Sequence, residues 1–137
     1  MARAFRYQFF VSLILFRTSK DQHAVSAKLA RFLRQNIRRN DCVGLLENRT
    51  FGVILLNSKV NHCLPVMQRL QSDFLFSVSK EHPDVELKAS HAVYPSEAEN
   101  LKSLQDLALK RLRAQKYTDL TIFLISPPAA PEPPAGP

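Results

Sequence analysis

Apolar positions along the chain recur with two different periods, and the alternation between these periods predicts an α+β domain. The run FRYQFFVSLILF, residues 5–16, is aromatic or aliphatic almost throughout and is typical of a buried strand. Two short apolar segments, 42–46 and 51–56, flank a polar tetrapeptide and predict a hairpin. The predicted strands are 5–16, 42–46, 51–56, 85–94 and 120–125.

Three other segments carry apolar residues at the spacing of a helix. In the first of them, Val25, Leu29 and Leu33 form one apolar stripe. Ser19 to Gln22 and Ser96 to Glu99 have the form of capping boxes, in which a serine precedes an amide or acidic residue by three positions. The predicted helices are 20–38, 58–75 and 97–115.

The ends of the first two helices depend on single residues. The first helix is expected to continue through Arg38 and to end near Arg39-Asn40, because cations in the last turn interact favourably with the helix dipole. Pro65 is expected either to kink the second helix or to lie in its first turn. The segment 74–83 is expected to be irregular.

The order of the predicted elements, β-α-β-β-α-β-α-β, contains a ferredoxin-like βαββαβ core with an extra helix and strand. The length of 137 residues suits one domain, which is expected to cover 1–126. Residues 127–137 are rich in proline and alanine and are expected to form a disordered tail. A ferredoxin-like core does not by itself identify a function.

The charge of the chain narrows the choice of partners. The net charge is +7, which favours anionic partners. A solvated basic surface is the alternative, because the cations are spread along the chain. Nucleic acid is not expected as a partner, since segments 51–56 and 85–94 lack a clear set of aromatics for stacking on RNA bases.

The sequence predicts no membrane span, no metal centre and no cofactor. The longest apolar run, 9–16, is far too short to cross a bilayer. Cys42 and Cys63 lack metal spacing and are expected to be reduced packing residues of a cytoplasmic protein. The histidines are scattered, with no pair at the spacing of ligands on a helix face: His23, His62, His82 and His91.

Candidate chemistry is concentrated between residues 37 and 51. Arg38 and Asp41 lie where the first helix meets the second strand, and Glu47-Asn48-Arg49-Thr50 forms the predicted hairpin tip. An Arg-x-x-Asp spacing arises by chance in about one such sequence in two. The alternatives are that Arg38 only interacts with the helix C-terminus, that Asp41 caps a turn, and that Arg69 on the next helix is solvated.

The same stretch resembles the signature region of GGDEF-type diguanylate cyclase domains, and the resemblance covers roughly residues 7 to 125. The Arg-x-x-Asp motif (38–41) matches the family's inhibitory-site motif. Five residues later comes the pentapeptide position (47–51), of which only the phenylalanine agrees. VELKASHAVYP (85–95) and LQDLALKRLR (104–113) are similar to later segments of the family. The resemblance implies a palm-like GGDEF fold and a bacterial signalling protein.

The departures from the family pattern fall on the catalytic positions. Glu47 and Asn48 replace two glycines that let the backbone approach the nucleotide. Arg49 and Thr50 replace the acidic pair, and Arg17-Thr18-Ser19 stands where the family has metal-binding carboxylates. Because magnesium needs anionic oxygen ligands, the resemblance implies that diguanylate cyclase activity is lost.

The inhibitory-site motif leads to a different expectation. In the family, this motif and an arginine on the next helix hold the guanines of cyclic di-GMP, and Arg38, Asp41 and Arg69 match these positions. A guanidinium donates two parallel bonds to guanine O6 and N7, and a carboxylate accepts from guanine N1–H and N2–H. The resemblance therefore implies a catalytically inactive receptor or regulatory module for cyclic di-GMP. It also allows a ligand-mediated dimer and a protein partner in a signalling pathway.

Two other functions stay open at this point. One is a protein–protein interaction domain that binds no nucleotide and acts through its surface or tail. The other is an active cyclase with unusual residues. Titration with cyclic di-GMP distinguishes the receptor from the interaction domain.

Overall fold

The described part of the computed structural model contains seven helices and strands, and none of these helices is long and apolar enough to cross a membrane. The described residues are 10–19, 23–47, 49–56 and 60–117. The elements are β1 (Val11–Thr18), α2 (His23–Gln35), β2 (Cys42–Glu47), β3 (Thr50–Leu56), α3 (Val60–Val78), β4 (Leu87–Tyr94) and α4 (Leu101–Ala114).

The four strands form one antiparallel sheet in the order β2-β3-β1-β4. This order, with α2 and α3 as the connections, is the predicted ferredoxin-like βαββαβ core, and α4 is the predicted extra helix. The α+β fold class is therefore confirmed. The predicted strand 120–125 and the predicted tail 127–137 lie outside the described residues.

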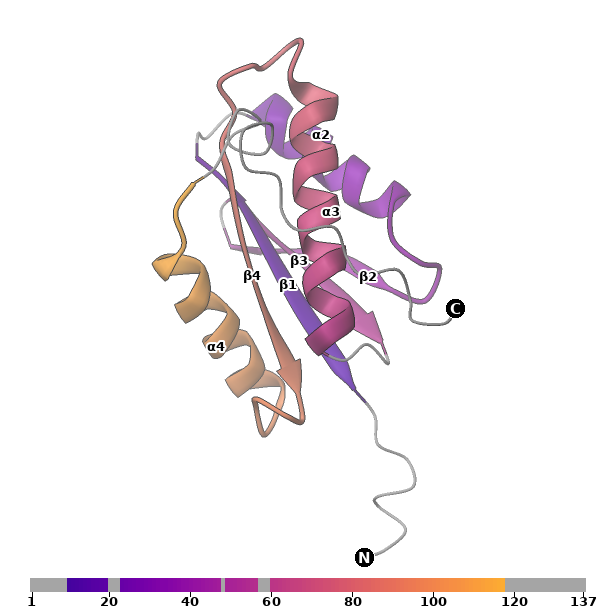
Figure 1. The fold of residues 1–137 in the computed structure, drawn as a ribbon, viewed down its shortest axis with the longest axis vertical. Coiled ribbons are helices and arrows are strands. Elements are labelled where there is room, and N and C mark those ends of the chain that lie inside the picture. The colour runs from indigo at the N-terminus through magenta and orange to yellow at the C-terminus, as the bar shows by residue number, and fades with distance from the viewer. Residues whose placement is uncertain (1–9, 20–22, 48, 57–59, 118–137) are drawn as a thin grey trace, which may run out of the picture.

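β1 is the centre of the structure because both of its faces are buried. Ile14 and Phe16 pack in the cluster that α2 and α3 form on one side of the sheet. Leu13 and Leu15 pack in the cluster that α4 forms on the other side, and Figure 1 shows α3 and α4 on opposite sides of the sheet. A strand that is buried on both faces favours apolar residues at nearly every position, which explains why β1 is apolar from Val11 to Phe16 except at Ser12.

The first helix ends three residues earlier than the sequence predicted, at Gln35 instead of residue 38. Asn36 accounts for the difference, because its side-chain amide donates to the Phe32 carbonyl over 2.8 Å and its backbone N–H donates to the Leu33 carbonyl over 3.2 Å. These bonds satisfy carbonyls of the last turn that have no partner inside the helix. Arg38 therefore lies in the loop after α2 and not in its last turn.

The second helix is longer than predicted and continues to Val78, so the expectation of an irregular segment from residue 74 was wrong there. Phe74, Leu75 and Val78 are buried in the core and continue the apolar stripe of α3. Pro65 lies inside the helix and not in its first turn.

The last helix begins at Leu101 and not at residue 97. Its capping box is formed by Asn100 and Ser103, whereas the predicted one began at Ser96. Glu97 accepts a hydrogen bond from the Val93 N–H instead of capping a helix. The other predicted box, 19–22, lies partly outside the described residues.

The two cysteines differ in environment. Cys63 is fully buried, and burial raises the pKa of its thiol to about 11, so the thiol stays protonated at neutral pH. Cys42 is exposed on β2, and both cysteines are free. Cys63 is a packing residue, as the sequence predicted.

Candidate functional site

A pocket of about 330 Å³ opens between the loop after α2, the end of β3 and one face of α3. Its lining combines apolar side chains with polar and charged ones. The three predicted ligand-binding residues, Arg38, Asp41 and Arg69, all line this pocket, although they come from three segments of the sequence. The complete lining is Asn36, Ile37, Arg38, Asp41, Leu55, His62, Val66 and Arg69.

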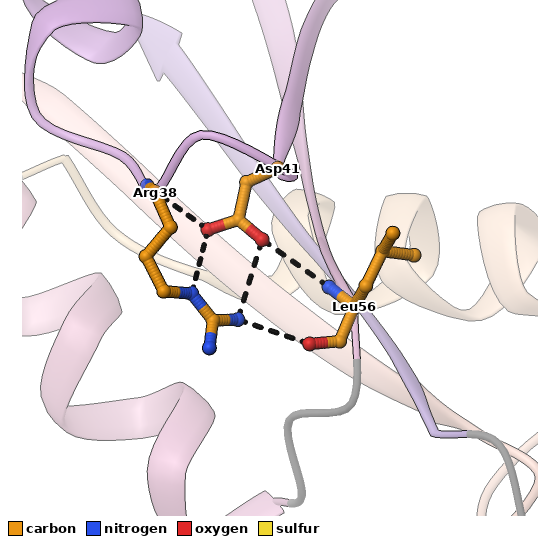
Figure 2. Close-up of polar contacts among 3 residues, drawn as sticks. All are labelled: Arg38, Asp41 and Leu56. Carbon is orange, nitrogen blue, oxygen red and sulfur yellow. Dashed lines mark hydrogen bonds and ion pairs between the residues drawn. The ribbon is translucent and has the colours of Figure 1, made fainter.

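Asp41 connects the loop to the end of β3, and its side chain is only 2% exposed. One carboxylate oxygen accepts from the backbone N–H and the Nε of Arg38, over 3.1 and 3.0 Å. The other accepts from an amino group of Arg38 over 3.2 Å and from the Leu56 N–H over 3.3 Å (Figure 2). The Asp41 N–H also donates to the Arg38 carbonyl over 3.0 Å, which closes the turn.

Asp41 therefore caps the turn, which is the alternative that the sequence left open. Both oxygens of Asp41 are directed at donors within the protein. A direct contact between Asp41 and the N1–H and N2–H groups of a guanine therefore requires some of these bonds to open. In the structure as it stands, Asp41 acts on the pocket by holding Arg38.

Arg38 is fixed on one side and exposed on the other. Its Nε and one amino group meet Asp41, and the same amino group donates to the Leu56 carbonyl over 3.0 Å. The side chain is nevertheless 62% exposed. A guanidinium that is held on one side and exposed on the other has a flat cationic face available, and such a face stacks well on aromatic rings.

The α3 wall of the pocket carries His62, Val66 and Arg69, which lie on one face of the helix because they are spaced by four and three residues. Arg69 is exposed, and its side chain makes no hydrogen bond or ion pair with another described residue. Arg69 was predicted from the sequence as a site residue, whereas His62 and Val66 were not. Their spacing from Arg69 was the signal that could have identified them.

Arg17, Arg49 and Thr50, for which the resemblance implies a departure from the catalytic pattern, lie at the opposite end of the sheet. The Nε of Arg17 on β1 donates to the Thr50 Oγ1 over 2.6 Å. Arg49 donates from an amino group to the Ser19 carbonyl over 3.0 Å, which ties the hairpin tip to the end of β1. Within the described ranges, no three histidine, cysteine, aspartate or glutamate side chains are grouped as metal ligands.

No family model matches the sequence, and no curated protein matches it either. Solved structures do match. A DGC protein from Thermotoga maritima superposes with a TM-score of 0.65 at 17% identity, over 81% of this chain and 83% of that chain. The active GGEEF domain of a diguanylate cyclase from Vibrio cholerae gives a TM-score of 0.65 at 15% identity, over 82% and 80%.

A third similar structure contains a ligand. The GGDEF domain of DgcB from Caulobacter crescentus, in complex with c-di-GMP, superposes with a TM-score of 0.64 at 12% identity, over 82% of this chain and 75% of that chain. The matches span most of each domain. This chain therefore has the fold of GGDEF-type diguanylate cyclase domains, as the resemblance implied.

The geometry of Asp41 gives a stability prediction. Asp41→Ala removes the acceptor of the Leu56 N–H and of the Arg38 N–H, which are both partly buried. We expect the free energy of unfolding in a urea titration to fall by about 2–3 kcal/mol. Asp106→Ala is the matched control, because Asp106 is exposed and, among the described residues, pairs only with Lys102 at 4.0 Å. That change should cost no more than about 0.5 kcal/mol. Equal losses in the two variants would contradict the structural role of Asp41.

Proposed function

We propose that this GGDEF-fold domain is a catalytically inactive receptor that binds cyclic di-GMP in the pocket between Arg38 and Arg69. The observation that carries the proposal is that these two arginines, from a loop and from α3, line one pocket together with apolar side chains. The c-di-GMP complex of DgcB, which has the same fold, supports the choice of ligand.

In the proposed complex the two arginines have different roles. Arg69 is exposed and its donors are not engaged by other described residues, so it supplies the bidentate contact to guanine O6 and N7. Arg38 is held by Asp41, so it supplies a fixed cationic face for stacking and charge for the anionic diester. Ile37, Leu55 and Val66 supply the apolar surface beneath a purine.

The absence of catalysis is the second part of the proposal. Magnesium prefers carboxylate and other hard oxygen ligands, and it holds and neutralises the phosphates in phosphoryl-transfer reactions. Arg17 and Arg49 instead bring two positive charges to the end of β1 and to the hairpin tip. Two cations at this place repel a divalent metal, which supports loss of cyclase activity.

The proposed receptor acts on a protein partner in a signalling pathway of the cytoplasm. Free cysteines at positions 42 and 63 are in keeping with a reducing compartment. A ligand held by Arg38 of one copy and Arg69 of another would also make a dimer. An interaction domain without a nucleotide ligand is the alternative, and it is the outcome if no nucleotide binds.

Calorimetric titration with cyclic di-GMP tests the receptor. We expect saturable binding that Arg69→Ala weakens about five- to a hundred-fold, because a bidentate base contact is lost. Arg38→Ala should weaken binding by about tenfold, which reflects the loss of stacking. Cyclic di-AMP should bind more weakly, since its adenine N6 amino group presents a donor to Arg69 where guanine presents an acceptor.

Arg113→Ala is the control for these variants. Arg113 is exposed in the last turn of α4, outside the residues that line the pocket, and its loss changes the net charge by the same amount. We expect this variant to bind as the parent protein does. Absence of binding by the parent, or equal effects of Arg113→Ala and Arg69→Ala, would leave the interaction domain as the function.

Incubation with GTP and magnesium tests the loss of catalysis. We expect no cyclic di-GMP above a control without enzyme, under conditions in which an active diguanylate cyclase domain forms product. Chromatography of the nucleotides provides the measurement. Product that disappears in an Arg49→Ala variant would show that the replaced positions still support the reaction.

A further inference from the structure

The two outer strands of the sheet differ in how their free edges are covered. The strand order β2-β3-β1-β4 leaves β2 and β4 on the outside, each with one side that pairs with no other strand of the described sheet. Backbone N–H and C=O groups on such a side can pair with a strand from another molecule. The covering of each edge therefore indicates where a further strand can add.

The free edge of β4 is covered by side chains. Arg111 on α4 donates to the His91 carbonyl over 2.9 Å, and Glu97 accepts from the Val93 N–H over 3.0 Å. The side chain of Gln71 on α3 donates to a third backbone carbonyl of β4. Because β1 occupies the other side of β4, these bonds lie on its free edge. They take up groups that an added strand would need, so this edge is protected.

The free edge of β2 has no such covering. Within the described part of the chain, no hydrogen bond from outside β3 reaches residues 42–46. None of these residues is buried, Leu45 is 65% exposed, and a Cβ added to Gly44 would meet nothing within 4 Å. The segment also contains no charged residue and no proline, which are the residue types that usually keep an exposed edge from pairing.

We propose that β2 pairs in the antiparallel direction with β2 of a second copy of this chain and joins the two sheets into one. The regular part of the strand, 42–45, forms the pairing, because the register with β3 shifts after Leu45. Two identical edges related by a two-fold axis make a closed dimer. Since the edge of β4 is covered, a head-to-tail contact between β2 and β4 of neighbouring copies is hindered, and the assembly stops at two.

The charges that flank β2 favour a second copy as the partner. Arg39 is exposed just before β2, and Glu47 is the last residue of the strand. Antiparallel pairing brings the start of one strand beside the end of the other, so residues of opposite charge come near each other at both ends. A parallel pair would bring like charges together. The segment is thus complementary to itself in the antiparallel direction.

Sedimentation velocity over a series of protein concentrations, without any nucleotide, tests the dimer. We expect the parent protein to pass from monomer to dimer as its concentration rises. Leu45→Lys should weaken dimerisation by about tenfold or more, because it places a positive charge from each copy beside the shared edge. This variant is expected to fold, since Leu45 is largely exposed. The experiment contains no cyclic di-GMP, so its outcome does not depend on the proposed receptor.

Leu101→Lys is the matched control, because Leu101 is 69% exposed at the start of α4 and lies outside β2. It should dimerise as the parent protein does. Amide hydrogen exchange of residues 42–45 should slow in the parent protein as the dimer forms. The pairing is refuted if the parent protein stays monomeric up to its solubility limit, if the two lysine variants behave alike, or if exchange in β2 does not change on dimerisation.

Discussion

The candidate ligand site depends on one buried carboxylate. Asp41 accepts four hydrogen bonds, three from Arg38 and one from the Leu56 N–H, and it thereby joins the loop after α2 to the end of β3. Without it, the loop would lose its bond to the Leu56 N–H, and the guanidinium of Arg38 would lose two of its bonds while keeping the one to the Leu56 carbonyl. The turn therefore orients the Arg38 side chain before a ligand binds. A ligand does not have to order this side chain on binding. Pre-ordered groups of this kind reduce the entropy lost on association.

The two ends of the sheet differ in how their charged side chains are compensated. β1 is packed on both faces, so its ends cannot move far without disturbing two clusters of buried residues. At one end, Asp41 compensates the charge of Arg38, and apolar side chains line the same pocket. At the other end, Arg17, Arg49 and Lys88 come together. The fold is shared with diguanylate cyclase domains, whereas these side chains belong to this sequence, and function is determined by the side chains.

The order of the elements and most of the core could be predicted from the sequence, because the periods of 2 and 3.6 residues are strong signals. The end of α2 could not be predicted from the sequence, because it depends on a hydrogen bond from the Asn36 side chain back to the Phe32 carbonyl. The start of α4 was misplaced because Glu97, which completes an apparent capping box, bonds to Val93 and to Arg111 instead.

For the candidate site, the residues could be predicted from the sequence, but the direction of one side chain could not. The sequence and its resemblance to a family selected Arg38, Asp41 and Arg69, and the structure places all three around one pocket. The inward direction of Asp41 could not be foreseen, because it requires the position of the Leu56 N–H, fifteen residues away. The pairing of Arg17 with Lys88 likewise follows from the register of β1 and β4, which no local pattern in the sequence defines.

An NMR titration of ¹⁵N-labelled protein with cyclic di-GMP tests the central claim most directly, because it maps the ligand onto individual residues. The account predicts that amide signals of Arg38, Leu56 and Arg69 shift saturably at stoichiometric ligand. Signals of Arg49 and Lys88 should stay in place at that concentration, since they lie at the other end of the sheet. Shifts confined to Arg49 and Lys88, or no saturable shifts at all, would contradict the account.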